Sequence, residues 1–406
     1  MVLGGLLPNT PVVNVAVILV ATGFIWFGSG WLEGSAEQLS AYYGLPAVVQ
    51  GSIVVAVGSS FPELSSVTFT ALAGSFDMGV GAIVGSAVFN VLVIPGLSGI
   101  TTDDDLETSR AIVYKEAQFY MIAVSALVIT FALAVIYVPV ADGSTLTGQI
   151  TRLLATIPLL LYGLYLFIQW QDVGDHEAED VSEGIAVGRE WGKLAVGLIV
   201  ILVAVEQLVG GVESLSHTFG IPEFLAGVTI IAAATSLPDT LVSVRSARAG
   251  KSATSLGNVL GSNTFDLLVA IPVGVLIVGS VPVDFAVAIP MFGVLTLATV
   301  LLFTILRTDL SLTGVESYGL LAAYLLFVAW VIAETVGVTQ LIQGGLITPT
   351  PWVRAASNSR KSTVGPIFLG TKIGQTYPPS VERFERIQYG WVTPLNCREI
   401  VNYLLD

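Results

Sequence analysis

The sequence GSSFPE at residues 58–63 recurs, with conservative changes, as ATSLPD at residues 234–239. Around these hexapeptides, residues 44–94 align with residues 220–270 at a constant offset of 176, and 15 of the 51 pairs are identical. In each copy a carboxylate follows a proline inside an apolar run, and a second polar residue, Asn90 or Asp266, lies 27 residues later. Because charge at membrane depth is costly, its appearance in both copies indicates a functional site.

The composition is that of a polytopic membrane protein. Hydrophobic residues make up 54% of the chain and charged residues 11%, and the mean hydropathy is +0.82. We predict ten transmembrane helices, each near the ~20 residues that one span requires. The predicted spans are roughly 10–31, 47–72, 79–100, 118–141, 150–171, 193–212, 223–247, 255–279, 282–306 and 318–341. The fold class is therefore all-α.

Basic residues predict the orientation of these spans. Loops after odd-numbered spans contain Arg110, Lys115, Arg189, Lys193, Arg245, Arg248, Lys251 and Arg307. Loops after even-numbered spans contain only Arg152. Since basic loops stay in the cytoplasm, the N-terminus is expected outside the cell membrane.

The repeat divides the chain into two halves of opposite orientation. Five spans per half is an odd number, so the second copy must enter the membrane from the other side, as in inverted-repeat transporters. We predict a first five-helix repeat at 1–171, with an ion-binding segment at 44–96. The second repeat is expected at 193–343, with an ion-binding segment at 220–272.

Two segments fall outside the repeats. The acidic linker at 172–192 is interpreted as a solvated cytoplasmic loop, with a regulatory divalent-cation site as the alternative. The tail at 344–406 has 7 basic and 4 acidic residues, whereas the preceding chain has 9 and 26. We interpret the tail as a disordered or non-native extension, with an extracytoplasmic appendage as the alternative.

The prolines of the two hexapeptides place oxygen atoms at membrane depth. Pro62 and Pro238 have no N–H, so the carbonyls of Gly58 and Ala234 lose their helical donors. Freed carbonyls in a membrane need a partner, and hard cations bind carbonyl, hydroxyl and carboxylate oxygens. The side chains with suitable oxygens at the repeated positions are Ser59, Ser60, Glu63, Ser86, Asn90, Thr235, Ser236, Asp239, Ser262 and Asp266. None offers sulfur or imidazole, which argues against zinc and copper.

Glycines and serines in these helices also have a simple packing role. Gly81, Gly85, Gly257 and Gly261 are expected to let the helices approach closely. A single serine would be explained by packing alone, whereas hydroxyls repeated around intramembrane acids indicate a site. The carboxylates of Glu63, Asp239 and Asp266 can neutralise one divalent ion or two to three monovalent ions, which is a physical basis for exchange.

The repeated segments resemble the α-repeats of the Ca²⁺/cation antiporter superfamily, in particular the prokaryotic sodium/calcium exchanger group. The resemblance rests on the motifs [ST]-S-x-P-[ED] and G-S-x-x-F-[ND] and covers the chain to about residue 342. It implies that Glu63 and Asp239 are the central Ca²⁺ ligands, with Asn90 and Asp266 beside them. By the same resemblance, the ligands for Na⁺ and Ca²⁺ include the hydroxyls of Ser59, Ser60, Ser86, Thr235, Ser236 and Ser262 and the carbonyls of Ala56 and Ala232.

Two positions depart from the family pattern and bear on ion preference and stoichiometry. Ala87 stands where many relatives have Asn, although its repeat counterpart is Asn263. Asp239 stands where archaeal relatives commonly have Glu, and potassium-dependent relatives have Asp. The shorter side chain moves a ligand back by on the order of 1.5 Å.

The expected function is antiport of Ca²⁺ against Na⁺ across the lipid bilayer. No cofactor, covalent chemistry or nucleic-acid partner is implied. Alternatives are a Ca²⁺/H⁺ antiporter of the same fold, K⁺-dependent Na⁺/Ca²⁺ exchange, a cation channel and an intramembrane aspartyl enzyme. The proton-coupled branch usually has a G-N-x-x-E pattern, which GSAVFN and GSNTFD lack, so sodium coupling is favoured.

Overall fold

The computed structural model describes residues 8–44, 56–102, 105–110, 112–140, 146–173 and 185–339. Its first-half elements are α1 (Pro11–Tyr42), α3 (Ala56–Ser59), α4 (Phe61–Ala73), α5 (Phe76–Ile100), β1 (Leu106–Glu107), the π-helix η3 (Ile112–Ala117), α6 (Gln118–Tyr137), β2 (Thr147–Thr151) and α7 (Arg152–Val173). Its second-half elements are α8 (Val187–Phe219), α9 (Glu223–Ala226), η4 (Gly227–Ile231), α10 (Ala232–Thr235), α11 (Leu237–Arg248), α12 (Ser252–Phe265), η5 (Asp266–Ala270), α13 (Ile271–Val278), β3 (Ser280–Asp284), α14 (Phe285–Arg307), β4 (Ser311–Leu312) and α15 (Gly314–Thr335). The predicted tail and residues 174–184 of the predicted linker lie outside the described residues.

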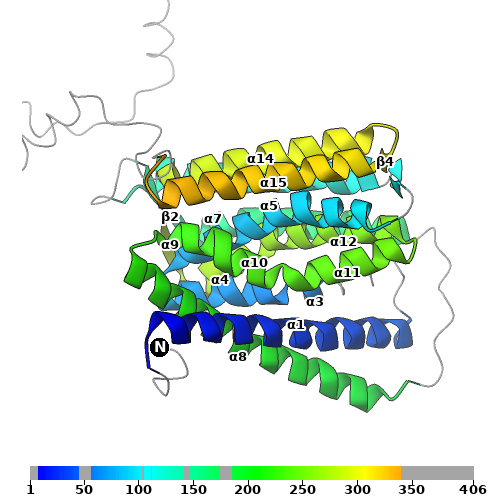
Figure 1. Ribbon diagram of the computed structural model, residues 1–406, viewed down its shortest axis with the longest axis horizontal. Coiled ribbons are helices and arrows are strands. Elements are labelled where there is room, and N and C mark those ends of the chain that lie inside the picture. Colours follow the sequence, from blue (N-terminus) through cyan, green and yellow to red (C-terminus); the bar gives the residue numbers. More distant parts are fainter. Residues whose placement is uncertain are drawn as a thin grey trace, which may run out of the picture. The chain divides into compact units, whose positions relative to one another are not determined.

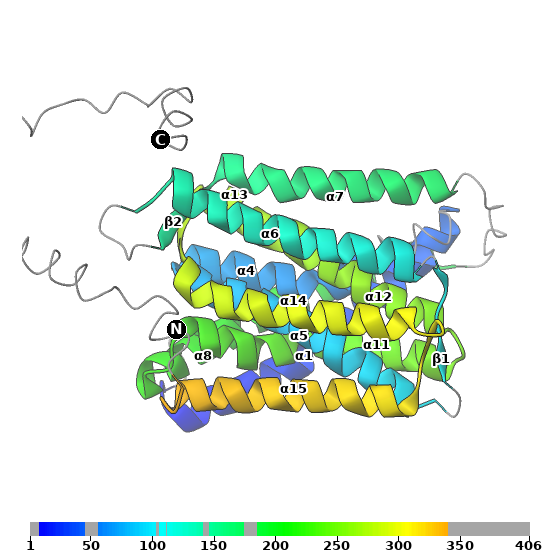
Figure 2. The same ribbon diagram turned by 90° about the horizontal axis from the view of Figure 1, so that it is seen from above.

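The described helices account for nine of the predicted spans. Eight are long and apolar enough to cross a membrane, and the bent pair Glu223–Thr235 and Leu237–Arg248 forms a ninth. Of the remaining predicted span, 47–72, residues 47–55 lie outside the described part of the chain, and α3 and α4 cover the rest. The axes of the long helices are roughly aligned, as α6, α7, α14 and α15 show in Figures 1 and 2. The protein is thus an all-helical membrane protein in its spanning part.

The helices α1 and α8 are longer than predicted. They contain 32 and 33 residues, so each is about 48–50 Å long, against a hydrocarbon core of about 30 Å. The predicted span at 193–212 therefore begins late and ends early, because α8 extends from Val187 to Phe219. The two backbones touch where small residues meet, since a Cβ added to Gly197 would lie 2.8 Å from the Gly28 carbonyl oxygen.

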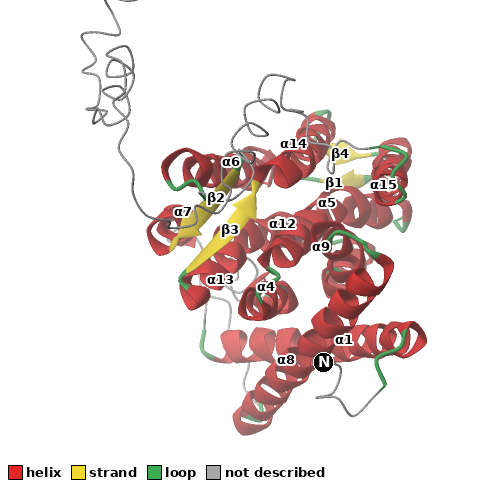
Figure 3. Ribbon diagram, turned by 90° about the vertical axis from the view of Figure 1, so that its left-hand side faces the viewer, coloured by secondary structure: helices red, strands yellow, loops and turns green. Residues whose placement is uncertain are grey.

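The helix α5 lies at the centre of the described bundle. It contacts α4, α11, α12, α14, α15 and η4, and 89% of its spanning window is buried. Viewed end-on, α5 and α12 lie inside the bundle formed by the other helices (Figure 3). A helix that is apolar all round is expected in such a position.

Glycines permit the closest backbone approach, as predicted for Gly81 and Gly85. A Cβ added at Gly85 would clash with the Val228 carbonyl oxygen, and one added at Gly81 would clash with that of Phe224. Helix α5 therefore packs directly on the backbone of the second repeat. At Gly257 the nearest atom would be 3.5 Å away, which is an ordinary contact.

Two small antiparallel sheets join residues of the two halves at the helix ends. Strand β2 pairs with β3, with Thr147 opposite Asp284, and β1 pairs with β4, with Leu106 opposite Leu312. The predicted spans starting at 150 and 282 therefore begin too early, because these residues belong to strands and the helices start at Arg152 and Phe285.

Candidate cation site

Each proline of the repeated hexapeptides lies just after a break between two short helices. Helix α3 ends at Ser59 and α4 begins at Phe61, with Pro62 in its first turn. In the second copy α10 and α11 are separated at Ser236, and the helices on either side are bent by 44°. Proline favours such breaks because it cannot donate to the preceding turn.

The breaks place Glu63 and Asp239 in the first turn of α4 and of α11. The N-terminal end of a helix has a positive potential that stabilises a carboxylate. Glu63 is 1% exposed, and Asp239 and Asp266 are 0% exposed. Carboxylates removed from water this completely need a compensating charge or donors.

Hydroxyl groups of one copy meet those of the other. Ser59 Oγ lies 3.0 Å from Ser262 Oγ on α12, and Ser86 Oγ on α5 lies 2.8 Å from Ser236 Oγ. Ser60 Oγ also donates to the Ser262 carbonyl oxygen at 3.5 Å. Each helix break therefore faces a spanning helix of the opposite repeat.

Asn90 supplies donors to the acid of the second copy. Its Nδ2 donates to Asp239 Oδ2 at 3.1 Å and to Asn263 Oδ1 at 3.0 Å. Ser262 Oγ donates to the other Asp239 oxygen at 3.4 Å. Asp239 is thus held by protein donors on both of its oxygens.

Glu63 and Asp266 lack hydrogen bonds of this kind, although the hydroxyls of Thr235 and Ser60 lie near Glu63 and Asp266 respectively. Within the described part of the chain, none of their four carboxylate oxygens has a hydrogen-bond partner, although all are buried. The two acids interact electrostatically with each other and each also with Asp239. Because the surrounding atoms are oxygens of carboxylates and hydroxyls, this group of side chains fits a hard cation.

The remaining predicted ligands have less distinctive surroundings. Thr235 lies near Glu63, and its Oγ1 donates to the Ile231 carbonyl oxygen at 3.1 Å. The Ala232 carbonyl accepts the Ser236 amide at 3.0 Å, and Ala56 is the first residue of α3. No three Asp, Glu, His or Cys side chains in the described ranges form a metal cluster by themselves, so a cation here would also need hydroxyl or carbonyl oxygens.

Sequence reasoning missed the role of Asn263. Its Nδ2 donates to the Ala87 carbonyl oxygen at 3.2 Å, while its Oδ1 accepts from Asn90. The motif GSNTFD contains this residue, and its repeat counterpart is Ala87 itself. The Ala87 carbonyl is therefore joined through Asn263 to the hydrogen bonds around Asn90.

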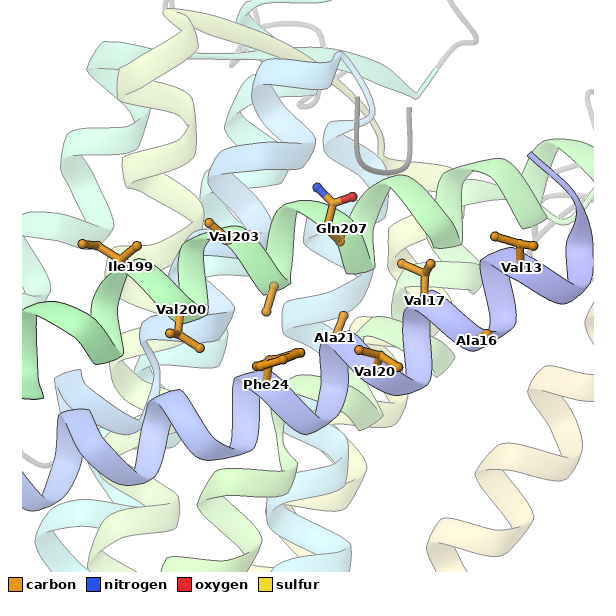
Figure 4. Close-up of a pocket in the computed structure, with 11 residues that line it drawn as sticks. Val13, Ala16, Val17, Val20, Ala21, Phe24, Ile199, Val200, Val203 and Gln207 are labelled. Carbon is orange, nitrogen blue, oxygen red and sulfur yellow. The ribbon is translucent and has the colours of Figure 1, made fainter. Parts of the chain in front are cut away.

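A groove elsewhere in the molecule is unsuited to cations. It has a volume of about 590 Å³ and lies between α1 and α8, with Phe24 and Val200 among its lining residues (Figure 4). Gln207 is the one polar residue among those lining it. Carboxylates do not line this groove, so the buried oxygen-rich cluster remains the candidate site.

Comparisons with known proteins show which sequences and structures this chain resembles. The sequence matches the family described as sodium/calcium exchanger protein over residues 13–171 and 190–333. It is 30% identical over 267 residues to the uncharacterized membrane protein MJ0091 of Methanocaldococcus jannaschii, covering 65% of this chain and 82% of that protein. It is 26% identical over 276 residues to the inner membrane protein YrbG of Escherichia coli, covering 64% and 79% respectively.

A solved structure shares the fold. The sodium-calcium exchanger NCX_Mj superimposes with a TM-score of 0.55 at 22% sequence identity, covering 79% of this chain and 99% of that chain. At this identity the likeness concerns the fold alone.

Proposed function

The chain belongs to the sodium/calcium exchanger protein family, and we propose that within it this protein exchanges Ca²⁺ for Na⁺ across the cell membrane by alternating access. It is a multi-pass cation transporter and not an enzyme. The observation that carries the proposal is the set of four buried oxygens of Glu63 and Asp266, beside Asp239, that accept no hydrogen bond from any residue the structure describes. Their negative charge is best compensated by a bound cation.

We propose the full architecture of ten helices in two inverted repeats, 1–171 and 193–343. The tenth span would lie over 47–72, the N-terminus would be outside, and the linker at 172–192 would be cytoplasmic. Support comes from the distribution of Lys and Arg and from the paired contacts Ser59–Ser262 and Ser86–Ser236, which relate the copies. The tail at 344–406 is proposed to be an appendage without a transport role.

The proposed site provides a reason for exchange. Glu63 and Asp239 would bind Ca²⁺ centrally, with Asn90, Asp266, the flanking hydroxyls and the carbonyls of Ala56 and Ala232 completing its oxygen ligands. A unit charge 4 Å from a cation contributes about 4 kcal/mol at an effective dielectric constant of 20. Na⁺ ions at the hydroxyls of Ser60, Ser86, Ser236 and Ser262 would use the same carboxylates. The two cations would therefore bind in alternation.

Proton coupling is the second candidate function. Glu63 and Asp266 are two neighbouring buried acids that accept no hydrogen bond within the described ranges, and such a pair can share a proton. A Ca²⁺/H⁺ antiporter of the same fold would use this proton in place of Na⁺. K⁺-dependent exchange remains a further variant, because Asp239 is the residue found in potassium-dependent relatives.

The test is Ca²⁺ uptake into proteoliposomes loaded with Na⁺, K⁺ or choline at equal pH on both sides. We expect uptake with Na⁺ inside and little with choline. A second series imposes a pH gradient without Na⁺. Stimulation by the pH gradient but not by Na⁺ would replace sodium coupling with proton coupling, and uptake that needs K⁺ together with Na⁺ would identify the potassium-dependent variant.

A further inference from the structure

A fourth buried acid, Glu33 on α1, lies outside the group of predicted ligands. The residue is 9% exposed, and its Oε1 accepts no hydrogen bond from any described residue. Its repeat counterpart at the offset of 176 is Val209, which is buried and apolar, so the repeat gave no signal for Glu33. A valine in the equivalent position shows that packing of this helix does not require a carboxylate.

Glu33 lies against the first helix break. A Cβ added to Gly58 would be 3.7 Å from Glu33 Cγ, and Gly58 directly precedes the hydroxyls of Ser59 and Ser60. The charged groups that act on Glu33 are, in decreasing order, Asp239, Arg245 and Glu37. The carboxylate of Glu33 is therefore near the buried acid of the second copy, although it belongs to a different helix.

The charged neighbours of Glu33 on α11 lie in the first and the last turn of that helix. Asp239 lies in the first turn of α11, whereas Arg245 lies in its last turn and is exposed. Both α1 and α11 run toward the right-hand end of the bundle in Figure 1. Glu33, on a helix that contacts α10 and α11, thus interacts with a fully buried acid and with an exposed basic residue in the last turn of α11.

We propose that Glu33 and Asp239 form an outer binding position for a divalent cation, between the C-terminal ends of α1 and α11 and the central site. This inference rests on the proposed function, because it assumes that a divalent cation reaches Asp239. Two carboxylates favour a divalent over a monovalent ion, since the Coulomb energy doubles with the charge. Arg245 repels the ion from this position and balances Glu33 when the ion is elsewhere.

The outer position predicts that the apparent affinity for Ca²⁺ depends on Glu33 from one face of the membrane only. An ion that enters from the end where α1 and α11 terminate passes Glu33, whereas one that enters from the opposite end reaches the central site first. Replacing Glu33 should therefore weaken Ca²⁺ uptake from one face only. A residue needed merely for folding would affect both faces.

The experiment measures Ca²⁺ uptake by full-length Glu33→Gln in right-side-out and inside-out vesicles whose sidedness is assigned with an N-terminal tag. We expect the apparent KM for Ca²⁺ to rise about tenfold from the face where α1 ends, with less than a twofold change from the other face. Arg245→Gln should lower the KM from the first face. Glu107→Gln, which removes an exposed acid that is not among the charged groups acting on Glu33, is the control and should change neither.

Glu33→Val introduces the residue found at the repeat counterpart, Val209. It serves as a second variant that is expected to fold, because it removes the buried carboxylate oxygens as well as the charge. An unchanged KM from both faces in both Glu33 variants, or an equal rise from both faces, would overturn the outer position. Equilibrium titration of the purified wild-type protein with Ca²⁺ separates this result from a failure of the proposed function. A wild-type protein that binds no Ca²⁺ would overturn both proposals, whereas normal wild-type binding with unaltered Glu33 variants would overturn only this one.

Discussion

The two copies of the repeated segment contain nearly the same oxygen atoms, yet their acids are not bonded alike. Asp239 accepts hydrogen bonds from Asn90 and Ser262, while Glu63 accepts none from the described residues. Helices of the two copies pack against each other, so Asn90 of the first copy donates to Asp239 of the second. Asp266 of the second copy lies near Glu63 of the first and interacts with it electrostatically. Asn90 and Asp266 occupy equivalent positions and differ in one group, an NH₂ in place of an oxygen. This difference gives Asp239 a hydrogen-bond donor and leaves Glu63 and Asp266 as the pair of carboxylates that needs a cation.

The backbone differs at the same pair of positions. Asn90 lies within the uninterrupted helix α5, whereas Asp266 is the first residue of the π-helical turn η5. Such turns insert a residue into a helix and often occur at functional sites. The second copy therefore departs from the first in both chemistry and local geometry at Asp266.

The largest expected effect comes from neutralising the acids that follow the prolines. Glu63→Gln and Asp239→Asn should each abolish Ca²⁺ transport while the protein still inserts, because removing one charge from a desolvated site costs several kcal/mol of ion binding. The measurement is Ca²⁺ uptake at matched expression, with Glu107→Gln as an exposed-acid control. Near-normal uptake by either variant would refute its central role.

A smaller effect is expected when the two copies are made alike at the second polar position. Asp266→Asn removes one of two neighbouring buried charges, so its thermal unfolding midpoint without cations should rise by roughly 2 °C or more. The increase caused by added Ca²⁺ should shrink, because a ligand charge is lost. The reciprocal Asn90→Asp variant should unfold at a lower temperature than the wild type in the same cation-free buffer. A lower midpoint for Asp266→Asn would contradict the proposed repulsion between Asp266 and Glu63.

Removal of the Asn90 amide tests how much the hydrogen bonds to Asp239 stabilise the protein. Asn90→Ala removes two donated hydrogen bonds and leaves Asp239 with fewer donors, which should destabilise the protein by about 1–3 kcal/mol. Chemical denaturation in detergent measures this change. Ser98→Ala is the control, because this buried hydroxyl on α5 pairs with Ser255 at 3.3 Å and has no part in the proposed site. Equal destabilisation by both variants would argue against a special role for the bonds to Asp239.

The smallest effect is expected from the tail, which has no counterpart in the repeat. Truncation after residue 343 should leave membrane insertion and Ca²⁺ flux unchanged, since the tail differs in charge from the rest of the chain. Detergent-solubilised yield and uptake per milligram of protein are the measurements. A truncated protein that fails to insert, or that inserts without transport, would show that the tail is required.

Features of the site could be predicted from sequence where a proline or glycine changes the backbone of the helix in which it lies. Pro62 and Pro238 predicted a loss of helical hydrogen bonds in the turns before them, and the structure has breaks in those turns, after Ser59 and Thr235. Gly81 and Gly85 predicted the close approach of α5 to a neighbouring helix. Helix lengths were less predictable. Helix α1 continues beyond its apolar part because packing against α8 stabilises turns that hydrophobicity does not mark.

The sequence by itself determined a duplicated segment with two proline breaks, and it placed carboxylates and hydroxyls at fixed offsets from them. These features follow from backbone chemistry, because a missing N–H acts on the preceding turn wherever the helix lies. Only the tertiary structure decided that Asn90 bonds to Asp239, that Asn263 reaches the Ala87 carbonyl and that Glu33 approaches the site from α1. These contacts join residues far apart in the chain, and they depend on how closely α5 can pack on the second repeat, which is a property of both surfaces together.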